Sequence, residues 1–179
     1  VQEYLLLQSL LGIWPLQNEA GTQDELRSRM EDYAIKSARE AKLSTSWLEP
    51  DAEYERVLRA YVGVLLPGND ARGFRRYFEP VLDRVLYFGL FNSLATLVLK
   101  LTVPGVPDIY QGNELPALVL VDPDNRRTPD FAAHAAALEQ MRTALAMKAP
   151  ADLLRDCMVD WRRGHLKLFV TWRLLELRR

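Results

Sequence analysis

The residues of this chain best suited to binding a polar ligand lie between positions 100 and 131, in the stretch KLTVPGVPDIYQGNELPALVLVDPDNRRTPDF. Carboxylates, carboxamides and guanidinium groups gather there, and these groups form the directional hydrogen bonds that a hydroxyl-rich ligand such as a sugar requires. The polar residues of this stretch include Gln111, Glu114, Asp124, Asn125 and Arg126. A structural interpretation competes with this one, in which the two adjacent arginines pair with nearby carboxylates and only fix the loop.

Outside this stretch, few residues suggest a catalytic, metal-binding or ligand-binding role. The two histidines lack a serine or cysteine partner motif and metal-ligand spacing, so we expect no metal site. The only cysteine, Cys157, cannot form an internal disulfide, and its expected role is that of a small buried hydrophobe. Trp47, within STSW, has two interpretations: it stacks on a sugar ring, or it packs between helices.

A short strand is expected to position the first of the polar groups. The prolines of VPGVP exclude a helix, and Val106, Ile109 and Tyr110 favour an extended chain. Gly112 permits a turn at the end of this strand, where a side chain would clash. Since a single strand leaves its backbone groups unpaired, we expect residues 103–112 to form a buried strand whose partners are few or lie outside this chain.

The remaining patterns are helical, and the expected fold class is mainly α, with roughly two-thirds of the residues in helices. Apolar residues recur at helical intervals, and breaks fall at proline- and glycine-containing loops. Thr22 and Glu25 have capping-box spacing, and Pro50 with Asp51 suits a first helical turn. Helices are expected over about 4–14, 22–41, 50–66, 70–101, 129–147 and 150–156, with a last one through 168–175.

Composition excludes several classes of protein. With 179 residues and a net charge of -1, the chain has no electrostatic attraction for nucleic acid. Its longest apolar run, residues 85–99, is shorter than the ~20 residues that span a bilayer, so we expect no membrane partner. The single cysteine fits a reducing compartment, and the expected localisation is cytoplasmic. The chain lacks an initiator Met, which suggests a piece of something longer.

The polar stretch also resembles a known family. LTVPGVPDIYQGNEL is similar to the Gly-x-Pro…Tyr-x-Gly-x-Glu segment at the eighth barrel strand of the alpha-amylase superfamily. More specifically, five blocks resemble the maltooligosyl trehalose synthases and occur in that family's order. These blocks are YLLLQSLLGIWPL, KSAREAKLSTSWLEPDAEYE, FGLFNSLATLVLKL, KLTVPGVPDIYQGNE…LVDPDNRR and KLFVTWRLLELRR.

This resemblance implies a (β/α)8 catalytic barrel, of which the chain would hold a late portion. Residues 1–83 would form a helical subdomain inserted in the barrel, and residues 84–179 the last barrel strand with its flanking helices. The family's catalytic carboxylates would lie upstream, so we nominate no catalytic residue here. The resemblance implies instead that the substrate-binding candidates are Gln111, Glu114, Asp124, Asn125 and Arg126. For Glu114 two roles stay open, an anchor of neighbouring groups or a direct sugar contact. The sequence departs from the family pattern at Pro116, Ala117 and Thr128, which puts the geometry of the site's rim in doubt.

The family activity is an intramolecular transglucosylation that needs no cofactor. It converts the reducing-end α-1,4 bond of a maltooligosaccharide into an α,α-1,1 bond. The resemblance therefore implies two partners for this chain, the maltooligosaccharide and the remainder of the same enzyme's barrel. By itself the chain is expected to be inactive.

Two other functions compete with this one. A stand-alone helical interaction module without catalysis would suit the terminal helices and the weak net charge, and composition alone does not exclude it. A related glucan hydrolase would share the last-strand motif but lack the DPDNRR and REAKLSTSW blocks together. The upstream reading frame discriminates between enzyme and module, because only the enzyme needs several hundred preceding residues that contain barrel strands.

Overall fold

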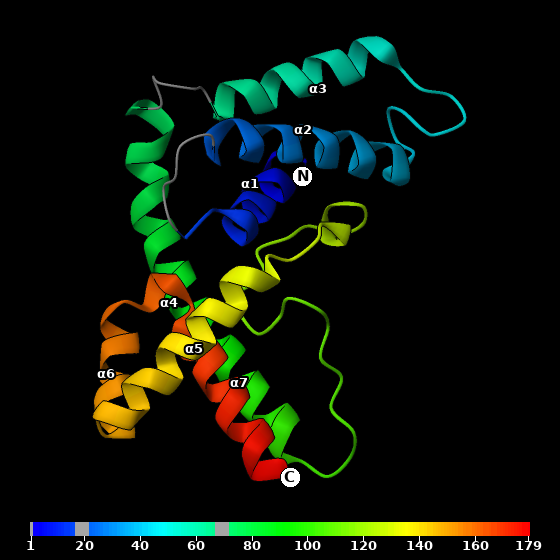
Figure 1. The fold of residues 1–179 in the computed structure, drawn as a ribbon. Coiled ribbons are helices and arrows are strands. Elements are labelled where there is room, and N and C mark those ends of the chain that lie inside the picture. The colour runs from blue at the N-terminus through cyan, green and yellow to red at the C-terminus, as the bar shows by residue number, and fades with distance from the viewer. Residues whose placement is uncertain (1, 17–21, 67–71) are drawn as a thin grey trace. The chain divides into compact units, whose positions relative to one another are not determined.

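The computed structural model describes residues 2–16, 22–66 and 72–179 (Figure 1). Within these ranges the chain forms helices and irregular segments but no strand, so the predicted mainly helical fold is confirmed. The helices are α1 (Gln2–Ile13), α2 (Thr22–Ala41), α3 (Ala52–Leu65), α4 (Arg72–Thr102), α5 (Phe131–Met147), α6 (Pro150–Val159) and α7 (His165–Arg178), with 3-10 turns η1 (Asp124–Arg126) and η2 (Trp161–Arg163).

The chain divides into two compact units. Unit 1 comprises Val1–Arg84 and Leu118–Arg126, and unit 2 comprises Val85–Ala117 and Arg127–Arg179. The sequence-based division at 83/84 assigned residues 118–126 to the second part, whereas here they pack with the first. As domains of a whole enzyme, the two predicted ranges stay a prediction.

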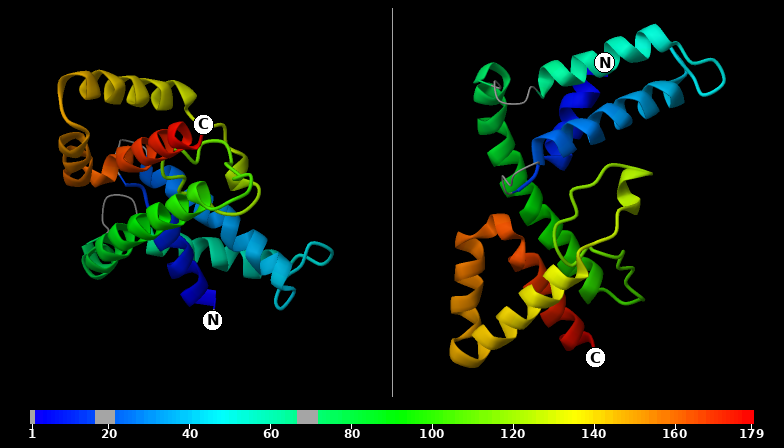
Figure 2. Two further views of the ribbon diagram at one scale, coloured as in Figure 1. Left: turned by 90° about the horizontal axis from the view of Figure 1, so that it is seen from below. Right: turned by 45° about the horizontal axis from the view of Figure 1, so that its top comes forward.

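Unit 1 is built on a helical hairpin. Helices α2 and α3 lie side by side, and α1 packs against α2 (Figures 1 and 2). The Asp51 carboxylate caps α3 by accepting a hydrogen bond from the Tyr54 backbone N–H at 2.9 Å, which agrees with the helix start predicted there. The buried core consists of apolar side chains from the three helices, including Leu6, Leu10, Ile13, Leu26, Met30, Ala34, Leu58 and Val62.

Unit 2 contains the C-terminal part of α4 and helices α5, α6 and α7. Its core cluster consists of Ala137, Met141, Leu153, Cys157, Leu168 and Phe169. Cys157 is 7% exposed, which confirms the predicted role of a small buried hydrophobe. Burial raises the pKa of its thiol, so the reactive thiolate is disfavoured.

The predicted buried strand at 103–112 is wrong for this structure. Residues 106–110 carry no regular secondary structure, and Val106 is 99% exposed. The physical reason is that a strand requires a neighbouring backbone, and none of the described residues forms a ladder with this segment. The turn at Gly112 is confirmed: its φ is +82°, and a Cβ there would lie 2.8 Å from the Pro129 side chain.

Helix α4 is the longest helix described, and it continues through Pro80. Over Arg76–Thr102 it is long and apolar enough to cross a membrane by length and composition, and it is the one such helix among the described residues. Core helices of soluble proteins have the same length and composition. The uncharged run 85–99, from which no membrane partner is expected, is shorter than this range.

Candidate functional site

The turn that carries three of the predicted binding residues is attached to α2 by a mostly buried ion pair. Arg29 Nε and Nη2 donate to the two carboxylate oxygens of Asp124, each at 2.8 Å. The same Nη2 donates to the Leu118 carbonyl at 2.7 Å. Asp124 also accepts from the Leu120 backbone N–H at 2.7 Å, so both of its oxygens are engaged within unit 1. In this arrangement Asp124 orders the turn η1.

The other contacts of this turn support the structural interpretation of the arginines. Arg126 forms an ion pair with Asp122, as that interpretation predicted, and the side chains of both are at least half exposed. Lys36 of α2 donates a hydrogen bond to the Asp122 carbonyl. The Lys36 contact holds the backbone of the loop, and the Arg126–Asp122 pair joins two side chains of the loop, so η1 is fixed from within unit 1.

Two predicted binding residues each have a buried side-chain oxygen without a hydrogen-bond partner. Asn125 Oδ1 and Glu114 Oε2 are buried and have no hydrogen-bond partner among the described residues. A buried acceptor without a donor is costly, so each atom is suited to accept a hydrogen bond from a group outside the described chain. Gln111 is exposed. Asn125 belongs to unit 1, whereas Gln111 and Glu114 belong to unit 2.

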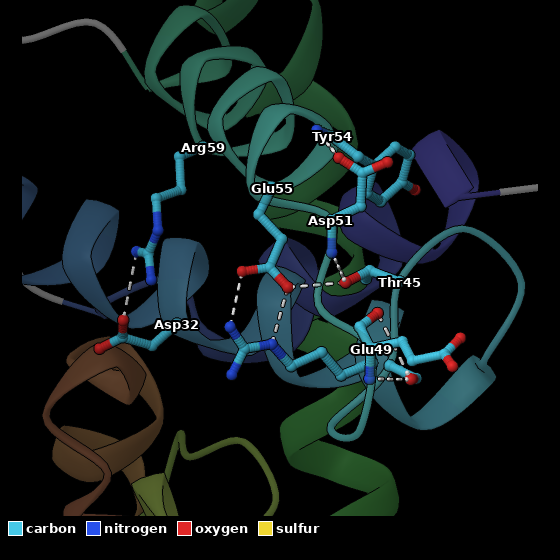
Figure 3. A network of polar contacts seen from close by, with 9 residues as sticks. Asp32, Thr45, Glu49, Asp51, Tyr54, Glu55 and Arg59 are labelled. Atoms are coloured by element: carbon cyan, nitrogen blue, oxygen red, sulfur yellow. Dashed lines mark hydrogen bonds and ion pairs between the residues drawn. The ribbon is translucent and has the colours of Figure 1, made fainter.

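A second polar cluster lies at the turn between α2 and α3 (Figure 3). Arg39 forms a bidentate ion pair with Glu55, at 2.7 Å from Nε to Oε1 and 2.6 Å from Nη2 to Oε2. The buried Thr45 hydroxyl donates to Glu55 at 2.7 Å and accepts from the Asp51 backbone N–H at 3.0 Å. One threonine thus joins the interhelical ion pair to the start of α3.

This cluster perturbs the Glu55 carboxyl strongly. The Arg39 guanidinium and then the Thr45 hydroxyl donate to it and lower the pKa of Glu55 from its ordinary 4.5 to about 2. The carboxylate is therefore ionised at any physiological pH. Its role in this structure is to hold the turn STSWLEPD, because both of its partners border that turn.

The low pKa of Glu55 gives a pH-dependent stability. Because the pKa is lower in the folded state, this contribution is fully present above about pH 4.5 and is lost as the pH falls towards 2. We expect Glu55→Gln to lower the urea unfolding midpoint of unit 1 above pH 4.5, and the difference from the wild type to shrink between pH 4.5 and 2. Glu49→Gln, at an exposed position in the same turn, is the control and should show no such trend. A difference for Glu55→Gln that is the same at pH 3 and pH 6 would contradict this assignment.

Trp47 lies in the turn that this cluster holds. Its side chain is 56% exposed, so the interpretation as a core residue between helices is wrong. The Arg39 guanidinium lies over its ring, 4.9 Å from the centroid, which orients the indole. An exposed, oriented indole presents a flat apolar surface, and stacking on a sugar ring stays a prediction.

The structure brings some of the predicted residues together and separates others. Asp124, Asn125 and Arg126 share the turn η1, and Trp47 lies in the same unit at the α2–α3 turn. Sequence reasoning missed Arg29, Lys36 and Arg39, which hold these two turns. No local signal could have identified Arg29, because its partner is 95 residues away. Among the described residues, no group of three or more potential metal ligands gathers.

Comparisons with known proteins extend over nearly the whole chain, although no family model matches it. A Mycobacterium tuberculosis protein that bears the name maltooligosyl trehalose synthase is 36% identical over 168 residues, which are 92% of this chain and 20% of that protein. The solved maltooligosyltrehalose synthase from Arthrobacter ramosus is 36% identical with a TM-score of 0.77, over 99% of this chain and 20% of that one. A second solved maltooligosyl trehalose synthase has 30% identity and a TM-score of 0.81, over 99% of this chain and 22% of that one.

The chain therefore matches one segment of longer proteins that bear the name maltooligosyl trehalose synthase. The resemblance to the maltooligosyl trehalose synthases, inferred from the five sequence blocks, is confirmed. The chain spans about one fifth of the length of the relatives that it matches.

Proposed function

We propose that the chain is part of an enzyme that isomerises the reducing-end α-1,4 bond of a maltooligosaccharide to an α,α-1,1 bond. The observation that carries this proposal is 36% identity to a maltooligosyl trehalose synthase over 92% of the chain. In such a reaction a carboxylate attacks the anomeric carbon while an acid protonates the leaving oxygen. The released glucose then turns and attacks the glycosyl-enzyme through its own anomeric hydroxyl. This hydroxyl gives its proton to the conjugate base of the acid, and the carboxylate is released.

In this proposal the chain contributes to binding and supplies none of the catalytic carboxylates. Asp124 is already engaged by Arg29, so its role at the rim is to hold the turn η1, while Asn125 offers a free acceptor to a sugar hydroxyl. The exposed Trp47 offers a stacking surface. Such groups keep the released glucose in place, and water must be excluded during its turn because hydrolysis competes.

The remaining expectations about the enzyme belong to the same proposal. The chain works with the rest of the barrel of the same polypeptide, without a nucleic-acid or membrane partner, in the cytoplasm. A stand-alone interaction module predicts instead a reading frame that lacks barrel strands upstream of these residues.

The direct test is an activity assay of the isolated chain with maltopentaose. We expect no trehalose-ended product and no loss of reducing ends, because the nucleophile and the acid are supplied by other parts of the enzyme. The longer enzyme that contains this chain should consume reducing ends under the same conditions. Turnover by the isolated chain would show that it holds its own catalytic carboxylates and would refute the assignment.

A further inference from the structure

Helix α7 and the turn before it hold the chain on the C-terminal side of Glu114. Lys167 Nζ, in the first turn of α7, donates a long hydrogen bond to the Leu115 carbonyl at 3.5 Å. The Leu115 side chain packs against the core cluster of unit 2. The next residue, Pro116, lies so close to Gly164 that a Cβ on the glycine would be 2.2 Å from the proline Cδ. The backbone that follows Glu114 is therefore fixed by α7.

The chain on the N-terminal side of Glu114 is fixed by a turn. The Asn113 backbone N–H donates to the Tyr110 carbonyl at 3.1 Å. Gly112 lies within this turn with a φ of +82° and is packed against the Pro129 side chain. Because the backbone is held on both sides, the direction of the Glu114 side chain depends on its rotamer and on the charges around it.

The charges of Glu114 and Lys167 are only partly compensated inside unit 2. Burial, and then the charge of Lys100, lowers the pKa of Lys167, whereas the Glu114 carboxylate acts in the opposite direction. The Lys167 ammonium and the Glu114 carboxylate therefore attract each other. Glu114 Oε2 is nevertheless buried without a hydrogen bond from any described residue.

This arrangement disfavours the role of Glu114 as an anchor of neighbouring groups. The anchoring carboxylates of this chain, Asp124 and Glu55, have both oxygens engaged by other groups of the chain. A buried acceptor without a donor is costly for stability, so such an atom calls for another partner. Incompletely paired ionisable groups of this kind gather at functional sites.

We propose that Lys167 is a positioning residue that directs Glu114 Oε2 towards a hydroxyl group of the maltooligosaccharide. It does so by holding the Leu115 backbone and by attracting the Glu114 carboxylate, without touching the sugar itself. This inference rests on the proposed function and names the residue behind one of its binding groups. An ionised acceptor forms a stronger hydrogen bond to a hydroxyl than a neutral acceptor does, so its direction matters for affinity.

Steady-state kinetics of the longer enzyme with maltopentaose test this inference through a double-mutant cycle. Glu114→Met removes the acceptor and should raise KM about tenfold with little change in kcat, because the contact is present in both the bound substrate and the transition state. Lys167→Met leaves the carboxylate but not its direction, and should raise KM about fivefold. The double variant should have the same KM as Glu114→Met, since Lys167 then has nothing to position.

Arg173→Met is the matched control on the same helix. Its side chain is 51% exposed and pairs with Glu176 at 2.6 Å, so the substitution removes a cation from α7 away from Glu114 and should leave KM unchanged. The melting temperature of each variant shows whether it is folded. A lower melting temperature and a lower kcat for Lys167→Met, with an unchanged KM, would assign Lys167 a purely structural role and overturn the inference.

Independent effects of the two substitutions, which multiply in the double variant, would overturn it as well. Calorimetric titration of the same proteins with maltopentaose separates this result from the proposed function. A wild-type enzyme that binds maltopentaose but forms no trehalose-ended product would refute the function, and the same cycle measured as Kd would then decide the role of Lys167. A wild-type enzyme that does not bind maltopentaose would refute both.

Discussion

Replacing Gly164 by alanine is expected to lower the free energy of unfolding of unit 2 by about 3 kcal/mol. Gly164 joins η2 to α7 with a φ of +71°, a conformation that costs an L-residue about 1–2 kcal/mol. An added Cβ would lie 2.2 Å from Cδ and 2.6 Å from Cγ of Pro116. These atoms belong to a rigid ring, so the backbone of one segment must move, and such overpacking costs about 1–3 kcal/mol more.

The matched control for this change is Gly89→Ala in helix α4. An added Cβ at Gly89 meets no atom within 4 Å, and its φ is ordinary. Because alanine favours a helix over glycine by about 1 kcal/mol, this variant should be slightly more stable than the wild type. Urea unfolding followed by tryptophan fluorescence measures both variants. Equal stability of Gly164→Ala and the wild type would show that Pro116 does not contact this turn in solution.

Replacing Arg29 by leucine is expected to destabilise unit 1 by about 3 kcal/mol. The side chains of Arg29 and Asp124 are 17% and 13% exposed, so water stabilises an unpaired charge there poorly. The variant removes the cation from a mostly buried carboxylate and also the donor to the Leu118 carbonyl. The segment 118–126 should then leave α2, and its backbone amides should exchange with deuterium faster.

Arg27→Leu is the control for this second change. Arg27 lies on the same helix and pairs with Glu31 at 2.8 Å, but its side chain is 47% exposed. Exposed pairs of this type contribute about 0.5 kcal/mol or less. Urea unfolding should therefore separate the two leucine variants clearly, and hydrogen exchange at Leu120 should change only for Arg29→Leu. If both variants lose the same small amount, the Arg29–Asp124 pair does not anchor the turn.

The helices could be predicted because their signals are local. Thr22 starts α2, and Pro150 starts α6, where the sequence indicated. Helix α5 begins at Phe131, two residues after the predicted proline, because the Asp130 carboxylate accepts from the Ala133 N–H and acts as its cap. Helix signals depend on neighbours within four residues, so a single sequence reveals them.

The polar turn was predicted in part. The pairing of Arg126 with Asp122 spans four residues and was within reach of sequence reasoning. The conformation of residues 103–112 could not be predicted from the sequence. A strand exists only when another backbone lies beside it, and propensity alone does not supply that partner. In this structure Arg178 of α7 instead donates to the carbonyls of Leu101, Val103 and Gly105, and so holds the start of that segment.

By itself, the sequence determined the helical pattern, the turn at Gly112 and the likeness to maltooligosyl trehalose synthases. Each of these depends on residues that are close together in the sequence. Only the tertiary structure decided which polar side chains have a hydrogen-bond or ion-pair partner and which do not. It engaged Asp124 through Arg29 and held the turn of Trp47 through Glu55. The physical reason is that charge pairing and burial depend on distances between residues far apart in the chain, and these distances exist only in the folded molecule.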